Sequence, residues 1–206
     1  MDITYLGAGG VKLGGKHLTV WCDPPPAAAK AKPPADVALF SSSDAKTDSG
    51  AIMTIDGPGE YEVKSALIVG VPARLHVDAD PAAAGSRGTI YAIDLDGVKV
   101  VFLGNVAAGL SNEQVEQLGR VDILIVPVGG HGLTLDAIAA TQIVTTLEPK
   151  YVIPTHYDDG KTKYAMPQDN LAKFTSEMGA SPEPVAKFRP NAKDMPLETT
   201  VVVLQA

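Results

Sequence analysis

Residues 89–105 read TIYAIDLDGVKVVFLGN, and this stretch decides how the chain is expected to fold. Two apolar runs, Thr89–Leu95 and Val98–Leu103, flank the dipeptide Asp96-Gly97. An aspartate followed by a glycine between two such runs is among the strongest short-range signals for a two-residue β-hairpin. The stretch therefore predicts an antiparallel hairpin that leads into a polar loop.

The chain before this hairpin reads as further strands separated by turns. Apolar runs alternate with glycine-rich or polar turns, and the expected strands cover residues 1–6, 11–13, 17–23, 37–40, 51–55, 59–63 and 66–71. Residues 24–34, PPPAAAKAKPP, cannot form a β-ladder because proline has no amide hydrogen. We expect a surface loop with polyproline character there.

The chain after the hairpin alternates between helices and strands. Helices are expected from a capping box of Ser111 and Gln114, from a cap at Thr134 or Asp136, and over residues 168–178. The second helix should bury one apolar face, formed by Ile138, Ile143, Val144 and Leu147. Strands are expected at residues 121–126, 151–153 and 199–204. Strands first and then strand–helix alternation predict an α/β fold of two packed sheets with helices outside, in one domain over residues 1–206.

Composition restricts the function classes. The chain has 206 residues, 45% of them apolar, so it can bury a sizeable core. A net charge of −7 without a long basic run argues against nucleic-acid binding. One cysteine, Cys22, cannot form an internal disulfide, and Met1 leads directly into a strand without a leader segment. We expect a cytoplasmic protein that does not bind membranes, with Cys22 in the core.

The order of these segments resembles the metallo-β-lactamase fold superfamily. The resemblance is to its small single-domain zinc-dependent hydrolases, the branch that includes L-ascorbate-6-phosphate lactonase. It covers nearly the whole chain and rests on MDITYLGAGG (1–10), ADVALFS (35–41), DGPGEYEVKSALIVGVP (56–72), VDILIVPVGG (121–130), EPKYVIPTHY (148–157) and ETTVVVL (198–204). It implies a four-layer αββα sandwich with the active site at the edge of the sheets.

The resemblance also implies a two-metal site, and this chain has lost most of it. The family loop S-H-x-H-x-D-H corresponds to residues 41–47, SSSDAKT, and an asparagine replaces the bridging aspartate. Only two of the expected ligand positions keep an imidazole. The former metal-ligand positions are Ser42, Asp44, Lys46, Thr47, His76, Asn105 and His156, and Ala8, Asp23 and His131 are further residues expected to line the cleft.

Lys46 places a cation where the family holds a metal. Two unit charges 4 Å apart repel by about 4 kcal/mol at an effective dielectric constant near 20, and a divalent ion is opposed more strongly. We therefore expect no cofactor, with Lys46 filling the vacancy by pairing with Asp44 or Asp23. The alternatives are that Lys46 points to solvent, and that Asp44, His76 and His156 keep one Zn or Mn ion.

Three functions follow from these residues, and the choice between them stays open at this point. The first is a degenerate family member without hydrolase activity that binds an unidentified small molecule, favoured as anionic, in the old cleft. The second is a metal-dependent hydrolase of lactones, esters or phosphodiesters with an unorthodox single-metal site. The third is a structural homo-oligomer. Whether the chain is an enzyme therefore depends on its metal content.

Overall fold

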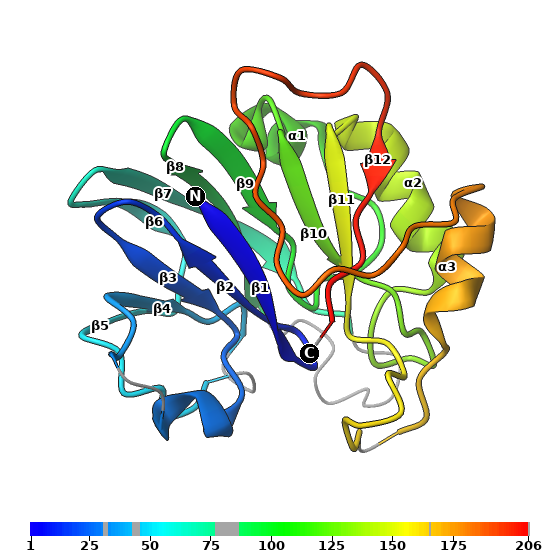
Figure 1. Cartoon of the computed structure of the whole chain (residues 1–206), viewed down its shortest axis with the longest axis horizontal. Helices are drawn as coiled ribbons and strands as arrows, with labels where there is room; N and C mark the ends of the chain where they lie inside the picture. The colour runs from blue at the N-terminus through cyan, green and yellow to red at the C-terminus, as the bar shows by residue number, and fades with distance from the viewer. Residues whose placement is uncertain (31–32, 43–45, 77–86, 165, 206) are drawn as a thin grey trace.

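The computed structural model describes residues 1–30, 33–42, 46–76, 87–164 and 166–205 and contains two β-sheets that face each other (Figure 1). The first sheet has five strands in sequence order: β1 (Asp2–Gly7), β2 (Gly10–Gly14), β3 (Thr19–Cys22), β4 (Val37–Leu39) and β5 (Met53–Ile55). Its first three strands are antiparallel, and β3, β4 and β5 are parallel. The expected amino-terminal strands are thereby confirmed.

The second sheet has seven strands in the order β12-β11-β10-β9-β8-β7-β6. Its strands are β6 (Gly59–Val63), β7 (Ala66–Arg74), β8 (Arg87–Leu95), β9 (Val98–Phe102), β10 (Ile123–Pro127), β11 (Tyr151–Thr155) and β12 (Thr200–Val201). The predicted hairpin is present as β8 and β9, and its two turn residues, Asp96 and Gly97, have φ angles of 53° and 80°. Positive φ at both positions is the requirement of a type I′ turn, which explains the aspartate–glycine pair.

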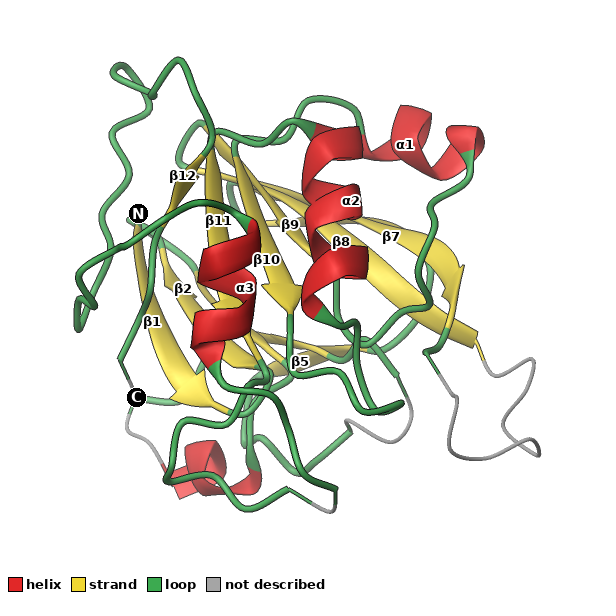
Figure 2. Ribbon diagram, turned by 90° about the vertical axis from the view of Figure 1, so that its right-hand side faces the viewer, coloured by secondary structure: helices red, strands yellow, loops and turns green. Residues whose placement is uncertain are grey.

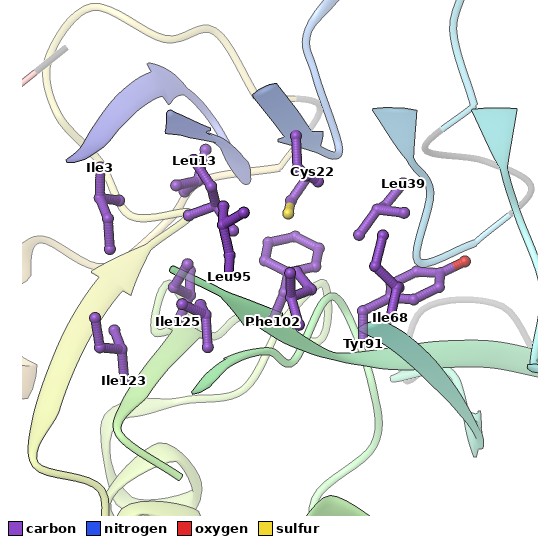
Figure 3. Close-up of a cluster of buried hydrophobic side chains, with 14 of the residues drawn as sticks. Ile3, Leu13, Cys22, Leu39, Ile68, Tyr91, Leu95, Phe102, Ile123 and Ile125 are labelled. Atoms are coloured by element: carbon purple, nitrogen blue, oxygen red, sulfur yellow. The ribbon is translucent and has the colours of Figure 1, made fainter. Parts of the chain in front are cut away.

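The core between the sheets is built from alternate residues of facing strands. Figure 3 shows Leu13 and Cys22 of the five-stranded sheet directed at Leu95 and Phe102 of the other, with Ile3 above Ile123 at one end of the cluster. Cys22 is completely buried in this cluster, as expected for a core residue. Burying these side chains stabilises the face-to-face packing by about 25 cal/mol per Å² of apolar surface.

Three α-helices cover the other face of the seven-stranded sheet (Figure 2). They are α1 (Asn112–Leu118), α2 (Ala137–Leu147) and α3 (Leu171–Glu177). The predicted capping box is present: the amide of Gln114 donates to Ser111 Oγ at 3.2 Å, and the amide of Ser111 donates to Gln114 Oε1 at 2.9 Å. Asp136, one of the two expected caps, begins α2 by accepting from the amide of Ala139 at 2.8 Å.

Two local predictions are wrong. Ile138 is 59% exposed. The buried face of α2 is formed by Ala137, Ala140, Ile143, Val144 and Leu147, and Ile138 lies outside this face. The proline-rich segment contains a 3-10 helix, η1 (Pro26–Lys30), where only an irregular loop was expected. Small alanines after a proline-fixed φ permit this tight turn.

The α/β class and the two packed sheets are confirmed. Among the described residues, all three α-helices belong to the seven-stranded side, so the fourth layer of the expected αββα arrangement contains no α-helix. In the same residues, no helix combines the length and apolar character that a bilayer crossing requires.

Candidate functional site

One edge of the sandwich gathers the loops that carry the predicted site residues. Strands β9, β10 and β11 are parallel, so their carboxyl ends meet at this edge. Asn105 follows β9, and His156 follows β11 directly. Strand β7 is antiparallel to β8, as is β9, so β7 also ends here, two residues before His76. We call Ser41, His76, Asn105 and His156, with the loops that carry them, the loop edge.

Asp23 and Ser41 connect the five-stranded sheet to the loop edge. The amide of Ser41 donates to Asp23 Oδ1 at 2.7 Å, and Ser41 Oγ donates to Oδ2 at 2.5 Å. The carbonyl of Ser41 accepts from the amide of Thr89 in the other sheet at 2.8 Å. Gly104 lies so close that a Cβ there would overlap the side chain of Ser41. Ser41 therefore holds the two sheets together beside Asn105.

The carboxyl group of Asp23 is electrostatically unusual. Burial raises its pKa to about 6, although both hydrogen bonds from Ser41 act in the opposite direction. Its backbone is left-handed, with φ of 41°. Asp23 thus lies in the expected region, but its carboxylate is already occupied by Ser41.

His76 and Asn105 lie side by side. The amide of His76 donates to the carbonyl of Asn105 at 3.1 Å. The side-chain Oδ1 of Asn105 is buried and accepts no hydrogen bond in the described part of the chain. A buried amide oxygen without a donor is costly, so a donor or a cation at this oxygen would stabilise the site.

His156 is held in one orientation, and its burial favours the neutral form of the ring. Its Nδ1 lies 3.2 Å from Gln168 Oε1, and Gln168 Nε2 donates to the carbonyls of Met166 and Pro167. Because the side-chain nitrogen of Gln168 donates to these carbonyls, the side-chain oxygen of Gln168 faces the imidazole. An oxygen can only accept, so Nδ1 of His156 is the donor. Burial lowers the pKa of His156, although the bond to Gln168 acts in the opposite direction. The neutral ring therefore carries its lone pair on Nε2, the form that binds metals.

The former metal loop is fastened by structural contacts. Lys46 Nζ lies 2.5 Å from a carboxylate oxygen of Asp56, and both side chains are about half exposed. The predicted pairing of Lys46 with Asp23 or Asp44 is therefore wrong for Asp23, whose carboxylate binds Ser41, and Asp44 itself lies outside the described residues. The hydroxyl of Thr47 donates to the carbonyl of Pro24 at 3.0 Å. Ser42 is buried at the start of this loop.

Of the two other residues expected to line the cleft, Ala8 lies next to the loop edge and His131 does not. The carbonyl of Ala8 accepts from the amide of His156 at 2.8 Å, so Ala8 does adjoin the loop edge. His131 is 46% exposed, and its Nε2 lies 2.9 Å from Asp169 Oδ1. Lys173 binds the same oxygen at 2.6 Å. These contacts tie His131 to the start of α3 rather than to the proposed cleft.

Gln168 was missed by sequence reasoning, although it sets the orientation of His156. It lies 12 residues further along the chain, in a stretch that reads as the start of a helix. The structure begins α3 at Leu171 instead. No spacing rule connects a glutamine at that distance to a histidine, so the sequence alone offers no signal for this contact.

The described residues do not form a complete metal site by themselves. No group of three or more His, Cys, Asp or Glu side chains in the described residues could hold a metal. The expected set of Asp44, His76 and His156 is not tested in full, since Asp44 lies outside these residues. The Nε2 lone pair of His156 and the unpartnered Oδ1 of Asn105 are suitable donors in chemical type.

Comparison with known proteins identifies the family. A family model described as a beta-lactamase superfamily domain matches residues 2–156. A UPF0173 metal-dependent hydrolase of Thermococcus onnurineus is 33% identical over 112 residues, which are 54% of this chain and 49% of the relative. A second one, from Pyrococcus furiosus, is 31% identical with the same coverage. The chain thus spans about half the length of the curated relatives it matches.

A solved structure agrees over the full length. A Thermotoga maritima protein assigned to the Zn-dependent hydrolases of the metallo-beta-lactamase superfamily is 28% identical, with a TM-score of 0.77 and complete coverage of both chains. This structure and the sequence relatives share one description, that of metal-dependent hydrolases.

Two expectations change as a result. The expectation of no cofactor is wrong, because the relatives are named metal-dependent hydrolases and that name implies a metal. The same names support the hydrolase alternative rather than a degenerate, non-catalytic member. With residues 2–156 matched by the family model and the whole fold matched by a solved relative, the chain belongs to the metallo-β-lactamase fold superfamily.

Proposed function

We propose that this chain is a metal-dependent hydrolase that uses a single metal ion at the loop edge. The observation that carries the proposal is the environment of His156. Burial lowers the pKa of its ring and so favours the neutral form, and the contact of Nδ1 with Gln168 leaves the lone pair on Nε2. Metal-binding histidines are typically held in this way, by a hydrogen bond to the ring nitrogen that does not bind the metal.

His156, His76 and Asn105 are the residues proposed to hold the ion. The two imidazoles and the amide oxygen come from segments that follow alternate strands of one sheet, β7, β9 and β11, and that end at the same edge. Imidazole donors favour Zn over Mg or Ca. When bound, such an ion supplies Lewis-acid polarisation of a carbonyl or phosphoryl oxygen.

A second ion has little to hold it. The loop positions that serve the second metal in the family pattern are Lys46 and Thr47, whose side chains bind Asp56 and the carbonyl of Pro24. Neither side chain is a metal ligand in these contacts. The three proposed donors, His76, Asn105 and His156, include no carboxylate to compensate a second divalent charge, which is unfavourable in an enclosed site.

The remaining residues of the site keep its parts in place. Gln168 fixes the ring of His156, and Ala8 fixes its backbone. Asp23 and Ser41 join the five-stranded sheet to the segment that contains Asn105. This arrangement orients the donors before any ligand arrives, and preorganisation lowers the free-energy cost of binding.

Elemental mass spectrometry of protein purified without chelator and re-equilibrated with zinc or manganese tests the proposal. We expect close to one metal ion per chain, lost in His156→Ala and retained in the matched control His17→Ala, whose histidine lies exposed in the turn between β2 and β3. The same samples should hydrolyse at least one of a lactone, a p-nitrophenyl ester and a phosphodiester, with activity lost in His156→Ala.

Other results would overturn the proposal. Two ions per chain would contradict the single-ion site. Protein that stays free of metal under both conditions would contradict metal-dependent hydrolysis altogether. Asn105→Asp sharpens the test, because it places a charged donor at the orphaned oxygen and should raise metal affinity roughly tenfold or more.

A further inference from the structure

A groove of about 680 Å³ lies between α2 and α3, which stand side by side on the outer face of the seven-stranded sheet (Figure 2). It follows α3 beside the first turn of α2. Its volume is within the range of roughly 300–1,000 Å³ that ligand pockets occupy, so it is large enough for a small molecule. Among the described residues that line it, none is a proposed metal donor.

Short side chains on both helices leave the space for this groove. Ala137 lines it from α2, and Ala172 and Ser176 line it from α3. Ala172 and Ser176 are four positions apart, so they lie on the same face of α3. Because neither helix places a long side chain at these positions, the space between them stays open.

An isoleucine of α2 faces this space. Ile138 lines the groove from the first turn of the helix and is 59% exposed. The buried residues of α2, such as Ala140 and Val144, pack against the sheet instead. Isoleucine is among the residue types that are most often buried. An apolar group in the groove would remove Ile138 from water, which is favourable in proportion to the area covered.

The charged side chains that line the groove are mostly acidic. Asp136, Asp169 and Glu177 contribute three carboxylates against the single ammonium group of Lys173, which is bound to Asp169 at 2.6 Å. Asp136 accepts from the amide of Ala139 and so offsets the partial positive charge at the start of α2. Glu177 makes no ion pair within the part of the chain that the structure describes. The groove therefore favours a positively charged group, and Glu177 is available to pair with it.

We propose that this groove binds a small organic cation in which an ammonium group is joined to an apolar chain. The ammonium group pairs with Glu177 on α3, and the apolar chain covers Ile138 on α2. Because these two residues line the groove from different helices, a ligand needs both parts to contact both residues. The proposal concerns a second site and does not depend on the hydrolase function.

Calorimetric titration of the purified protein tests this inference. The probes are hexylammonium, hexanol and heptanoate, which share one hexyl chain and differ in the charge of the end group. We expect hexylammonium to bind roughly tenfold or more tightly than either of the other two. Glu177→Gln should weaken hexylammonium binding roughly tenfold, the usual effect of losing one charge-assisted hydrogen bond. Ile138→Ser should weaken the binding of hexylammonium as well, because it removes the apolar contact.

Two matched controls remove the same kinds of side chain outside the groove. Glu116→Gln removes an exposed carboxylate of α1, and Leu197→Ser removes an apolar side chain that is 95% exposed, so both should leave binding unchanged. Equal binding of heptanoate, no binding of hexylammonium, or unchanged binding in the Ile138→Ser/Glu177→Gln double variant would overturn the inference. Both substituted residues are exposed, so these variants should fold. The titration does not depend on metal content, which tests the hydrolase proposal separately.

Discussion

Replacing Asp23 by asparagine should change how the stability of this protein depends on pH. Burial raises the pKa of the Asp23 carboxyl to about 6, from an ordinary value of 3.8. A folded-state pKa above the unfolded value means that protonation stabilises the native state. This contribution is present in full below about pH 4 and is lost as the pH rises through about 6.

The size of the effect follows from the two pKa values. Their difference corresponds to about 3 kcal/mol, at roughly 1.4 kcal/mol for each pKa unit. When the pH falls from about 7.5 to about 4.5, the free energy of unfolding should rise by about 2 kcal/mol through this group. The rise is smaller than the full difference because at about pH 4.5 the unfolded carboxyl also begins to bind protons. Asparagine has the same shape and can keep both contacts with Ser41, so Asp23→Asn removes the titration with little change in packing.

Urea unfolding of the metal-free protein at the two pH values measures the difference in unfolding free energy between wild type and Asp23→Asn. The wild type should gain about 2 kcal/mol relative to the variant at the lower pH. Asp36→Asn is the control. A hydrogen bond from Lys64, together with one from the amide of Thr19, lowers the pKa of Asp36 below its ordinary value, so Asp36 stays charged throughout this range. A wild-type advantage over Asp23→Asn that is the same at both pH values would refute the assignment.

Three further substitutions test the loop edge. Gly104→Ala should destabilise the protein by about 2 kcal/mol or more in urea unfolding, because the new Cβ overlaps a neighbouring serine and φ is 64°. Gln168→Leu should lower metal affinity about tenfold in a chelator competition, because it removes the acceptor of the His156 Nδ1 proton; unchanged affinity would contradict the proposed orientation. Lys46→Met should cost less than about 1 kcal/mol in urea unfolding, because its ion pair is half exposed, and a larger loss would mean that the lysine has a buried role.

Local chemistry explains which parts of the fold the sequence predicts. The hairpin at Asp96-Gly97 and the capping box of Ser111 and Gln114 depend only on residues a few positions apart in the chain. Both can therefore be predicted from the sequence. The exposure of Ile138 depends on where α2 begins relative to the sheet. Such tertiary placement cannot be derived from the periodicity of one helix.

The site shows the same limit more strongly. The resemblance places His76 and His156 at metal-ligand positions, and in the structure His76 follows β7 by two residues and His156 follows β11 directly. The sequence offered Asp23 and Asp44 as partners of Lys46, and the structure shows Asp56 instead. Ser41 occupies the carboxylate of Asp23 through two hydrogen bonds. Competition between partners is settled by the folded geometry, which a residue pattern does not contain.

The backbone at the loop edge supports the proposed site only together with its side-chain contacts. Ala8, Asp23 and His156 have φ angles of 53°, 41° and 52°, a left-handed conformation that costs a residue with a side chain roughly 1–2 kcal/mol.

Positive φ alone does not mark a functional site in this chain. Lys64, Asp96, His131 and Glu148 share it, and Asp96 and Glu148 lie in a hairpin turn and at the end of α2. What distinguishes His156 is that its backbone amide is bound to the carbonyl of Ala8 and its ring Nδ1 contacts Gln168. Both contacts fix the direction of Nε2, and a fixed Nε2 is what a metal-binding histidine requires.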